Sequence, residues 1–364
     1  MILEDIYQGS IGVGPEYEHA AVLFIGSESY DAPTITIMEG LQELDFTVYT
    51  IGKPNINSWF VNQVIDDPQK VRFDFIISNL HWGTRFSLYS KFGLHDKIKV
   101  LIDGDDHVKP WGAKYQYWRS KYQGCPPEEV MRREMQPYRW MDDLSNYEPD
   151  VVFVSQKEYG SKDYYLPFGI QREYMQFAKR APTRQRGIDF AHVMGTGGGR
   201  RGETAQFIRS HALPGRVYND RIYGGEVIPN SLRDKVRLDN NIHSYHRWVH
   251  HSRYFSLLNN TKVLIYPGVT KQWDSKRPWE GYASGCLVLL QEPNIDVSQY
   301  PVTELCPYAV YDSHNGLLNK CNELHWNTGH LDKLRIETVE MAHRYFTPGP
   351  LARYFLRRIK DNTG

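Results

Sequence analysis

One carboxylate stands out in the stretch DSKRPWEGYASGCLVLL, residues 274–290. Glu280 lies at the expected start of a short helix over residues 279–284, which leads into an apolar strand. A carboxylate accepts several hydrogen bonds at once, which matches the paired 2′ and 3′ hydroxyls of a ribose. The small residues 283–285 would let this helix pack close to the neighbouring backbone. The alternative is an ordinary first-turn glutamate that the helix dipole favours.

A glycine-rich turn with two arginines, GTGGGRRGE, occupies residues 195–203 between an expected strand and an expected helix. Glycines let the backbone approach a ligand, and a helix N-terminus offers free N–H groups to a phosphate. The turn departs from the dinucleotide fingerprint and lacks the GK[ST] of a P-loop. The pattern therefore favours a nucleoside diphosphate over a plain turn with solvated arginines. Arg200 and Arg201 could donate charge-assisted hydrogen bonds to the phosphate oxygens, beside a turn that contains Gly195, Gly197 and Gly198.

Four histidines, His243, His246, His250 and His251, crowd one segment. Positions 243, 246 and 250 share one face of a helix, where three imidazoles could hold zinc. No carboxylate or cysteine completes a recognisable zinc motif, and the four cysteines are scattered without a C-x-x-C pair. The alternative is a polar helix face or hydrogen bonds to a ligand, and we expect no metal site.

Length and charge limit the class of protein. The chain has 364 residues, which suits two domains, and its 43 basic and 43 acidic side chains cancel. A neutral total argues against a dedicated nucleic-acid binder. No apolar run approaches the ~20 residues of a membrane span, and the first residues, MILEDIYQGS, do not resemble a signal peptide. We therefore expect a cytoplasmic protein without a membrane span.

Apolar strand patterns alternate with helical patterns along the whole chain. This alternation indicates parallel sheets covered by helices on both faces. We expect a Rossmann-like domain over 1–168, a basic linker over 169–187 and a second Rossmann-like domain over 188–345. A last helix over 346–364 is expected to pack back on the first domain. The expected strands lie at 20–26, 47–52, 73–79, 99–107, 151–156, 188–195, 216–224, 262–268, 286–291 and 307–313.

Four segments together resemble one enzyme family. SKRPWEGYASGCLVLLQEP resembles the R-x-(F/W)-E-x-x-x-x-G-x-x-(V/L) signature of GT-B glycosyltransferases, and is closest to their CgeB-type (spore maturation protein-like) branch, which is similar to glycosyltransferase family four. The strand and LP-x-G of 151–170, the strand and glycine turn of 188–203, and the helix and strand of 246–268 resemble the same family. The resemblance covers roughly residues 150–300, and only the strand order fits before that.

The resemblance implies an α/β GT-B fold, in which two Rossmann-like domains face each other across a cleft. It implies transfer of a sugar, a hexose first of all, from a nucleotide diphosphate donor to an acceptor hydroxyl without a metal, with a UDP-sugar as the first candidate donor. The second domain would bind the donor and the first the acceptor. Glu280 would hold the ribose, the glycines would form the close turn, and the diphosphate would be held by Lys276, Arg277, Arg200 and Arg201.

A cluster of acids, IDGDDH, ends an expected strand at residues 102–107. By resemblance, Asp105, Asp106 and His107 are candidates to contact the donor sugar or to accept the proton of the acceptor hydroxyl. The same acids could instead cap a turn. Asp103 and Asp105 also resemble the D-x-D metal motif of GT-A glycosyltransferases, although a second Rossmann-like half argues against that class.

Several alternatives stay open. The family often carries a second acid eight residues before the ribose glutamate, and this position is Gln272, so the stereochemical outcome is open and a non-catalytic nucleotide-sugar-binding relic is an alternative. A NAD(P)-dependent oxidoreductase that uses the glycine turn is another. The acceptor could be a small molecule, a protein, a glycan or a modified DNA base. The basic segments 171–186 and 352–360 could contact DNA phosphates or could be solvated faces.

Overall fold

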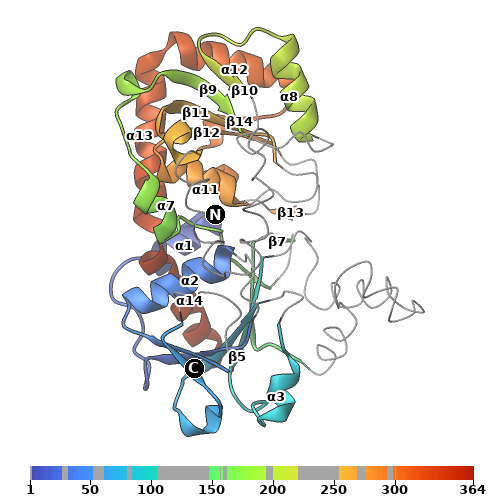
Figure 1. The fold of residues 1–364 in the computed structure, drawn as a ribbon, viewed down its shortest axis with the longest axis vertical. Coiled ribbons are helices and arrows are strands. Elements are labelled where there is room, and N and C mark those ends of the chain that lie inside the picture. Colours follow the sequence, from blue (N-terminus) through green and yellow to red (C-terminus); the bar gives the residue numbers. More distant parts are fainter. Residues whose placement is uncertain are drawn as a thin grey trace, which may run out of the picture. The chain divides into compact units, whose positions relative to one another are not determined.

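The computed structural model of the chain (Figure 1) describes most of its residues, and every structural statement below concerns these. The chain divides into two compact units, each described here by itself. The first comprises Met1–Gly169, Ile295–Gln299 and Thr347–Gly364, and the second comprises Ile170–Asn294 and Tyr300–Phe346. The described residues are 2–26, 32–51, 61–79, 84–104, 147–155, 157–158, 162–193, 200–219, 254–268, 275–292, 298–299 and 301–364.

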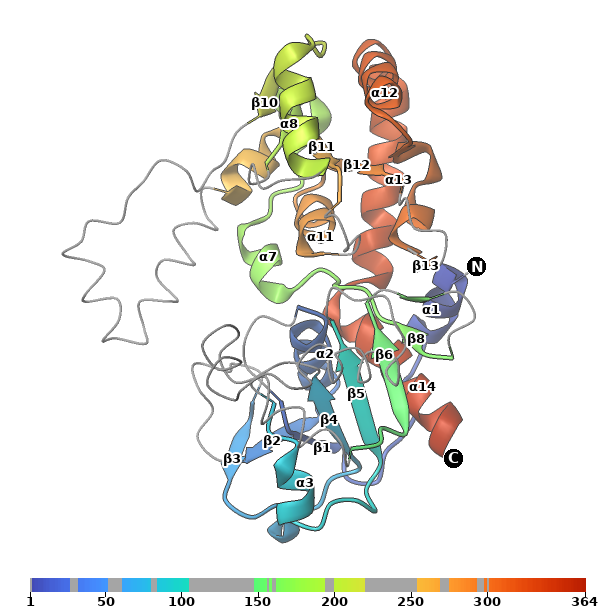
Figure 2. The same cartoon turned by 90° about the vertical axis from the view of Figure 1, so that its right-hand side faces the viewer.

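The first unit contains a seven-stranded parallel sheet in the order β3-β2-β1-β4-β5-β6-β8 (Figure 2). Its central strand β4 is buried at every residue, including the polar Ser78 and Asn79 at its end. A two-residue pair, β7 (Lys157–Glu158) with β13 (Ser298–Gln299), is antiparallel. The sheet strands are β1 (Ala21–Phe24), β2 (Thr47–Ile51), β3 (Gln63–Ile65), β4 (Phe75–Asn79), β5 (Lys99–Asp103), β6 (Val151–Val154) and β8 (Tyr164–Tyr165).

Helices from both ends of the chain cover this sheet. The last helix, α14 (Pro348–Thr363), packs against α2 (Ala32–Glu43) and α1 (Ile2–Ser10). Its Phe355 ring lies 4.5 Å from the ring of Phe153 on β6, measured between centroids. The end of the chain is therefore part of the first unit. The remaining helices of this unit are α3 (Ser87–Lys91) and the 3₁₀ turn η1 (Pro68–Lys70).

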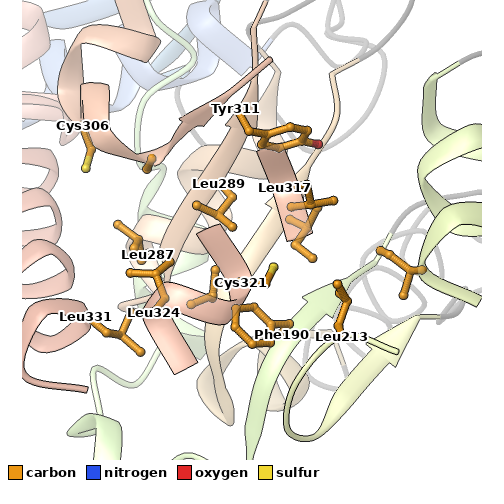
Figure 3. Packing of buried hydrophobic residues seen from close by; sticks show 14 residues of the cluster. Phe190, Leu213, Leu287, Leu289, Cys306, Tyr311, Leu317, Cys321, Leu324 and Leu331 are labelled. Atoms are coloured by element: carbon orange, nitrogen blue, oxygen red, sulfur yellow. The ribbon is translucent and has the colours of Figure 1, made fainter. Parts of the chain in front are cut away.

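The second unit contains a five-stranded parallel sheet in the order β10-β9-β11-β12-β14. Apolar residues of β9 and β12 pack with those of α12 in one core cluster (Figure 3). The strands are β9 (Ile188–His192), β10 (Val217–Asn219), β11 (Thr261–Tyr266), β12 (Leu287–Gln291) and β14 (Val310–Tyr311). The helices are α7 (Arg172–Phe177), α8 (Arg200–Ser210), α11 (Lys276–Ala283), α12 (His314–Trp326) and α13 (Thr328–Tyr345), with η2 (Thr183–Gln185), η3 (Pro301–Leu305), η4 (Pro307–Ala309) and a helical segment at 254–259.

The expected α/β class with two parallel sheets is confirmed, and each expected strand has a counterpart. The sequence did not indicate β3, β7, β8 and β13, which have only two or three residues each. From Ile170 on, the segment expected as a linker belongs to the second unit and contains α7 and η2. It is ordered because Arg186, which is 3% exposed, anchors it through buried hydrogen bonds. The expected cleft between the domains stays a prediction.

No helix in the described part of the chain is long and apolar enough to cross a membrane. Within the same residues no three metal-ligating side chains gather at one point.

Candidate functional site

Glu280 lies inside a helix and not at its start. The helix α11 begins at Lys276, so Glu280 is its fifth residue, and the alternative of an ordinary first-turn glutamate is wrong. The expected start after Pro278 was too late, because proline fits the first turn, where its missing N–H would be unpaired anyway. Ser275 caps the helix: its Oγ accepts from the Arg277 N–H at 3.3 Å and from the Tyr266 hydroxyl at 2.8 Å.

The two ends and one face of α11 fix its position against the sheet. Gly285, with φ of 77°, ends the helix, and the Cys286 N–H returns to the Gly281 carbonyl at 2.9 Å. Gly281 faces the sheet so closely that a Cβ there would lie 2.8 Å from Leu264 and 2.9 Å from Val288. Besides the small residues 283–285, the close approach therefore depends on Gly281, which the sequence interpretation did not single out.

The Glu280 carboxylate is buried and paired. The residue is 1% exposed, and its Oε2 accepts from Arg277 Nη1 at 2.9 Å. Arg277 in turn lies over the ring of Tyr254, with its guanidinium carbon 4.6 Å from the ring centroid. Burial raises the pKa of the Tyr254 hydroxyl well above its ordinary value; the Arg277 charge opposes this rise and the Glu280 charge adds to it. The three side chains thus form one buried group.

The Glu280 carboxylate has acceptor sites beyond its ion pair with Arg277. The Glu280 side chain accepts a hydrogen bond from Arg277 at Oε2, and the Tyr254 hydroxyl also interacts with this carboxylate. An ionised carboxylate has about four lone-pair sites, so both oxygens can still accept from hydroxyls. A buried charge with spare acceptors is costly unless a partner fills them. The arrangement suits a ligand that brings two neighbouring hydroxyl groups.

Arg200 and Arg201 begin α8, beside the carboxyl ends of the strands. Arg200 Nη1 donates to the Glu292 carbonyl, just after β12, at 2.8 Å. The Nε of Arg201 is buried and has no hydrogen-bond partner among the described residues. The first turn of a helix and two guanidinium groups favour an anion here. The glycines expected to complete this turn, Gly195, Gly197 and Gly198, lie outside the described residues.

A buried histidine that the sequence interpretation missed lies in the same region. His192 ends β9, is 1% exposed, and its Nδ1 lies 2.9 Å from Oδ1 of Asn219 on the neighbouring strand. The Asn219 amide nitrogen donates to the Ala205 carbonyl at 2.9 Å, so its oxygen is the acceptor and His192 Nδ1 carries the proton. Burial, helped by Arg201 and Arg209, lowers the pKa of His192 to about 4, although the Asn219 bond opposes this.

His192 is therefore neutral at physiological pH, and its Nε2 is a buried acceptor with no partner among the described residues. The signal for it in the sequence was a polar residue at the end of an apolar strand, IDFAH, just before the glycine turn. That signal is weak, because a histidine at a strand end is common in ordinary cores.

The proton-accepting candidates Asp105, Asp106 and His107 lie outside the described residues, as do the histidine cluster and Gln272. Asp103, the first acid of the D-x-D alternative, ends β5 and is 1% exposed. The roles assigned to these residues stay predictions.

The basic segments offer less to a DNA backbone than their composition indicates. In α14, Arg353 Nε donates to the Ser10 carbonyl at 3.1 Å, and Arg357 donates to the carbonyls of Gln8, Ile11 and Val13 at 2.6–3.0 Å. In the other segment Arg186 is buried. These arginines bind backbone carbonyls of their own unit.

Comparison with known proteins gives matches in structure but not in sequence. No family model and no curated protein sequence matches the chain. The structure of HepE from Anabaena, in complex with UDP and glucose, matches with a TM-score of 0.51 at 10% identity and covers 94% of this chain and 99% of HepE. An O-GlcNAc transferase from Thermobaculum terrenum matches with a TM-score of 0.50 at 10% identity, over 99% of this chain and 74% of the transferase. With its two parallel sheets and their helices, the chain has the GT-B fold.

Proposed function

We propose that this protein is a glycosyltransferase that transfers a sugar from a nucleoside diphosphate sugar to an acceptor hydroxyl. The observation that carries the proposal is the buried Glu280 carboxylate, held at one oxygen by Arg277 and with further acceptor sites open. The 2′ and 3′ hydroxyls of a ribose are the donors that this carboxylate would bind. The resemblance of the surrounding stretch to the CgeB-type branch supports the same role.

The donor's diphosphate would lie at the start of α8. Arg200, Arg201 and the first N–H groups of α8 supply positive electrostatic potential. Lys276, the first residue of α11, precedes Glu280 in the same helix and supplies a third cation. Arg277 was expected to bind the diphosphate, but its ion pair with Glu280 favours a role in orienting the carboxylate. We therefore assign the diphosphate to the other three cations and to the glycine turn.

The reaction then needs few chemical groups. The bond from the sugar's anomeric carbon to the β-phosphate oxygen breaks, and a bond from that carbon to the acceptor oxygen forms. The acceptor proton leaves to a base, for which Asp105, Asp106 and His107 are the candidates. Cations and helix N–H groups stabilise the departing diphosphate, and this stabilisation supplies most of the rate enhancement. The proposal includes no metal ion.

UDP-glucose is the first donor to test, since HepE, which shares the fold, is seen with UDP and glucose. The acceptor class is open between a small molecule, a protein, a glycan and a DNA base. The position of Gln272 leaves open whether the anomeric configuration is retained.

The test is calorimetric titration of UDP, GDP, ADP, dTDP and NAD⁺ into the wild type and Glu280→Gln. We expect one diphosphate to bind, and the variant to bind it about 10- to 100-fold more weakly, because charge-assisted hydrogen bonds contribute about 1.5–3 kcal/mol. Glu337→Gln, an exposed change in the same unit, is the matched control.

Three outcomes separate the proposal from its alternatives. Binding of a diphosphate together with release of sugar or UDP from its sugar nucleotide supports a transferase. Binding without any turnover or donor hydrolysis indicates the non-catalytic relic. Failure of every diphosphate to bind, or NAD⁺ binding that is indifferent to Glu280→Gln, would overturn the proposed site.

A further inference from the structure

Two buried arginines hold the C-terminal end of α11. Arg186 Nη2 donates to the Ser284 carbonyl at 2.6 Å, and Arg335 Nη1, on α13, donates to the Gly285 carbonyl at 2.8 Å. Their exposed fractions are 3% and 6%. A helix of eight residues is far below the length of ~12–15 residues at which a helix becomes stable alone, so its position depends on such contacts.

Arg186 also holds the element that carries Tyr254. Its Nη1 donates to the Leu258 carbonyl at 3.2 Å, at the end of the helical segment 254–259, and to the Thr261 carbonyl at 2.6 Å. One guanidinium group therefore joins the end of the segment that carries Tyr254 to the end of the helix that carries Arg277 and Glu280. It fixes the distance between the parts of the buried Tyr254–Arg277–Glu280 group.

The two cations are neutralised mainly by carbonyl dipoles. Among the described residues the carboxylate nearest to either cation is that of Asp332, whose oxygen lies 4.0 Å from Arg335 Nε and whose side chain is 47% exposed. Arg335 Nε itself donates to the Thr183 hydroxyl at 2.8 Å. The C-terminal carbonyls of a helix carry a partial negative charge that stabilises a cation. Apolar side chains in place of Arg186 and Arg335 would be buried at a lower desolvation cost, but they could not donate hydrogen bonds to the carbonyls at the end of α11.

We propose that Arg186 and Arg335 are positioning residues of the donor site, which fix α11 so that the Glu280 carboxylate meets the ribose. The inference rests on the proposed function, since it gives these residues their effect through Glu280. The segment 179–186, expected from the sequence as a linker, is then part of the donor-binding apparatus: Arg186 Nε donates to the Ala181 carbonyl of that segment at 2.9 Å.

A double-mutant cycle on UDP affinity tests this. Arg186→Lys and Arg335→Lys are each made in the wild type and in Glu280→Gln, and the Kd for UDP is measured by calorimetry. A lysine keeps the charge but cannot reproduce the fixed fork by which Arg186 binds several carbonyls and Arg335 binds a carbonyl and a hydroxyl. We expect each lysine to weaken UDP binding about tenfold in the wild type and less than about twofold in Glu280→Gln, because an effect that acts through Glu280 is non-additive.

The matched control is Arg357→Lys, which loosens another arginine that binds backbone carbonyls, in the first unit. It is expected to leave the Kd for UDP unchanged. If a lysine variant does not fold, Thr183→Val takes its place. It removes the hydroxyl that accepts from Arg335 Nε and donates to Asp332, and it is expected to show the same non-additivity at about threefold.

Equal weakening in both backgrounds, or unchanged affinity of the lysine variants, would overturn the positioning role and leave the proposed function intact. If Glu280→Gln itself binds UDP as the wild type does, the proposed function fails and the positioning role fails with it.

Discussion

At the scale of single residues, the pair of Glu280 and Arg277 sets the cost of changing either partner. Arg277→Met leaves a carboxylate that is 1% exposed without its cation, and we expect a loss of about 3 kcal/mol in the unfolding free energy of the second unit. The double variant Arg277→Met with Glu280→Gln should lose less, because no buried charge remains. Urea unfolding of the four proteins measures this. A double variant that loses the sum of the two single losses would contradict the buried pair.

His192 predicts how stability depends on pH. Its pKa falls from 6.5 in the unfolded chain to about 4 in the fold, so between these values the unfolded state binds more protons and stability rises with pH. The stability that the neutral His192 contributes is lost as the pH falls from 6.5 toward 4. Below pH 4 this loss amounts to up to about 3 kcal/mol. His192→Gln should flatten this part of the profile.

The profile is measured by urea unfolding from pH 4 to 7.5, with the exposed His211→Gln as control. His343, whose pKa is also lowered mainly by burial, contributes to the pH dependence of stability that remains in the variant. An unchanged slope in His192→Gln would show that folding does not lower the pKa of His192.

At the scale of elements, the close packing of α11 on β11 and β12 depends on Gly281. A Cβ at this position would lie 2.8–2.9 Å from Leu264 and Val288, so Gly281→Ala must push the helix away from the sheet. Overpacking of this kind costs about 1–3 kcal/mol. We also expect weaker nucleotide binding, since the shift moves Glu280.

The matched control is Gly329→Ala in α13, where the nearest atom to the new Cβ is 4.0 Å away. This change should be neutral or stabilise by up to about 1 kcal/mol, because alanine is the better helix former. Chemical unfolding and UDP titration of both variants check the pair. Equal stability of the two would show that α11 does not press on the sheet at Gly281.

At the scale of the whole molecule, the chain returns to its first unit at the end, through α14. Phe355 of α14 is fully buried beside Phe153, so Phe355→Ala should cost the first unit about 3–5 kcal/mol. The second unit should keep its nucleotide site, and UDP should still raise its transition temperature by mass action. Scanning calorimetry with and without UDP separates the two effects. Loss of the UDP-dependent shift would contradict the independence of the two cores.

The sequence alone predicted the elements well and the contacts poorly. Apolar runs bounded by glycine and polar residues located every strand of four or more residues, because burial on both faces leaves a local pattern. Of the strands with two or three residues, β10 and β14 were located, whereas β3, β7, β8 and β13 were not. The start of α11 was missed because a proline in a first turn resembles a break between elements.

By itself, the sequence determined the α/β class, the two parallel sheets and Glu280 as the first candidate for a binding residue, since each rests on a local pattern of residue types. Only the tertiary structure decided that Arg277 pairs with Glu280 under Tyr254, that Asn219 fixes His192, and that Arg186 and Arg335 cap α11. Most of these partners lie tens of residues apart in the chain. Their meeting follows from the strand order of the sheet and the packing of helices on it, and these depend on all of the contacts of the unit at once.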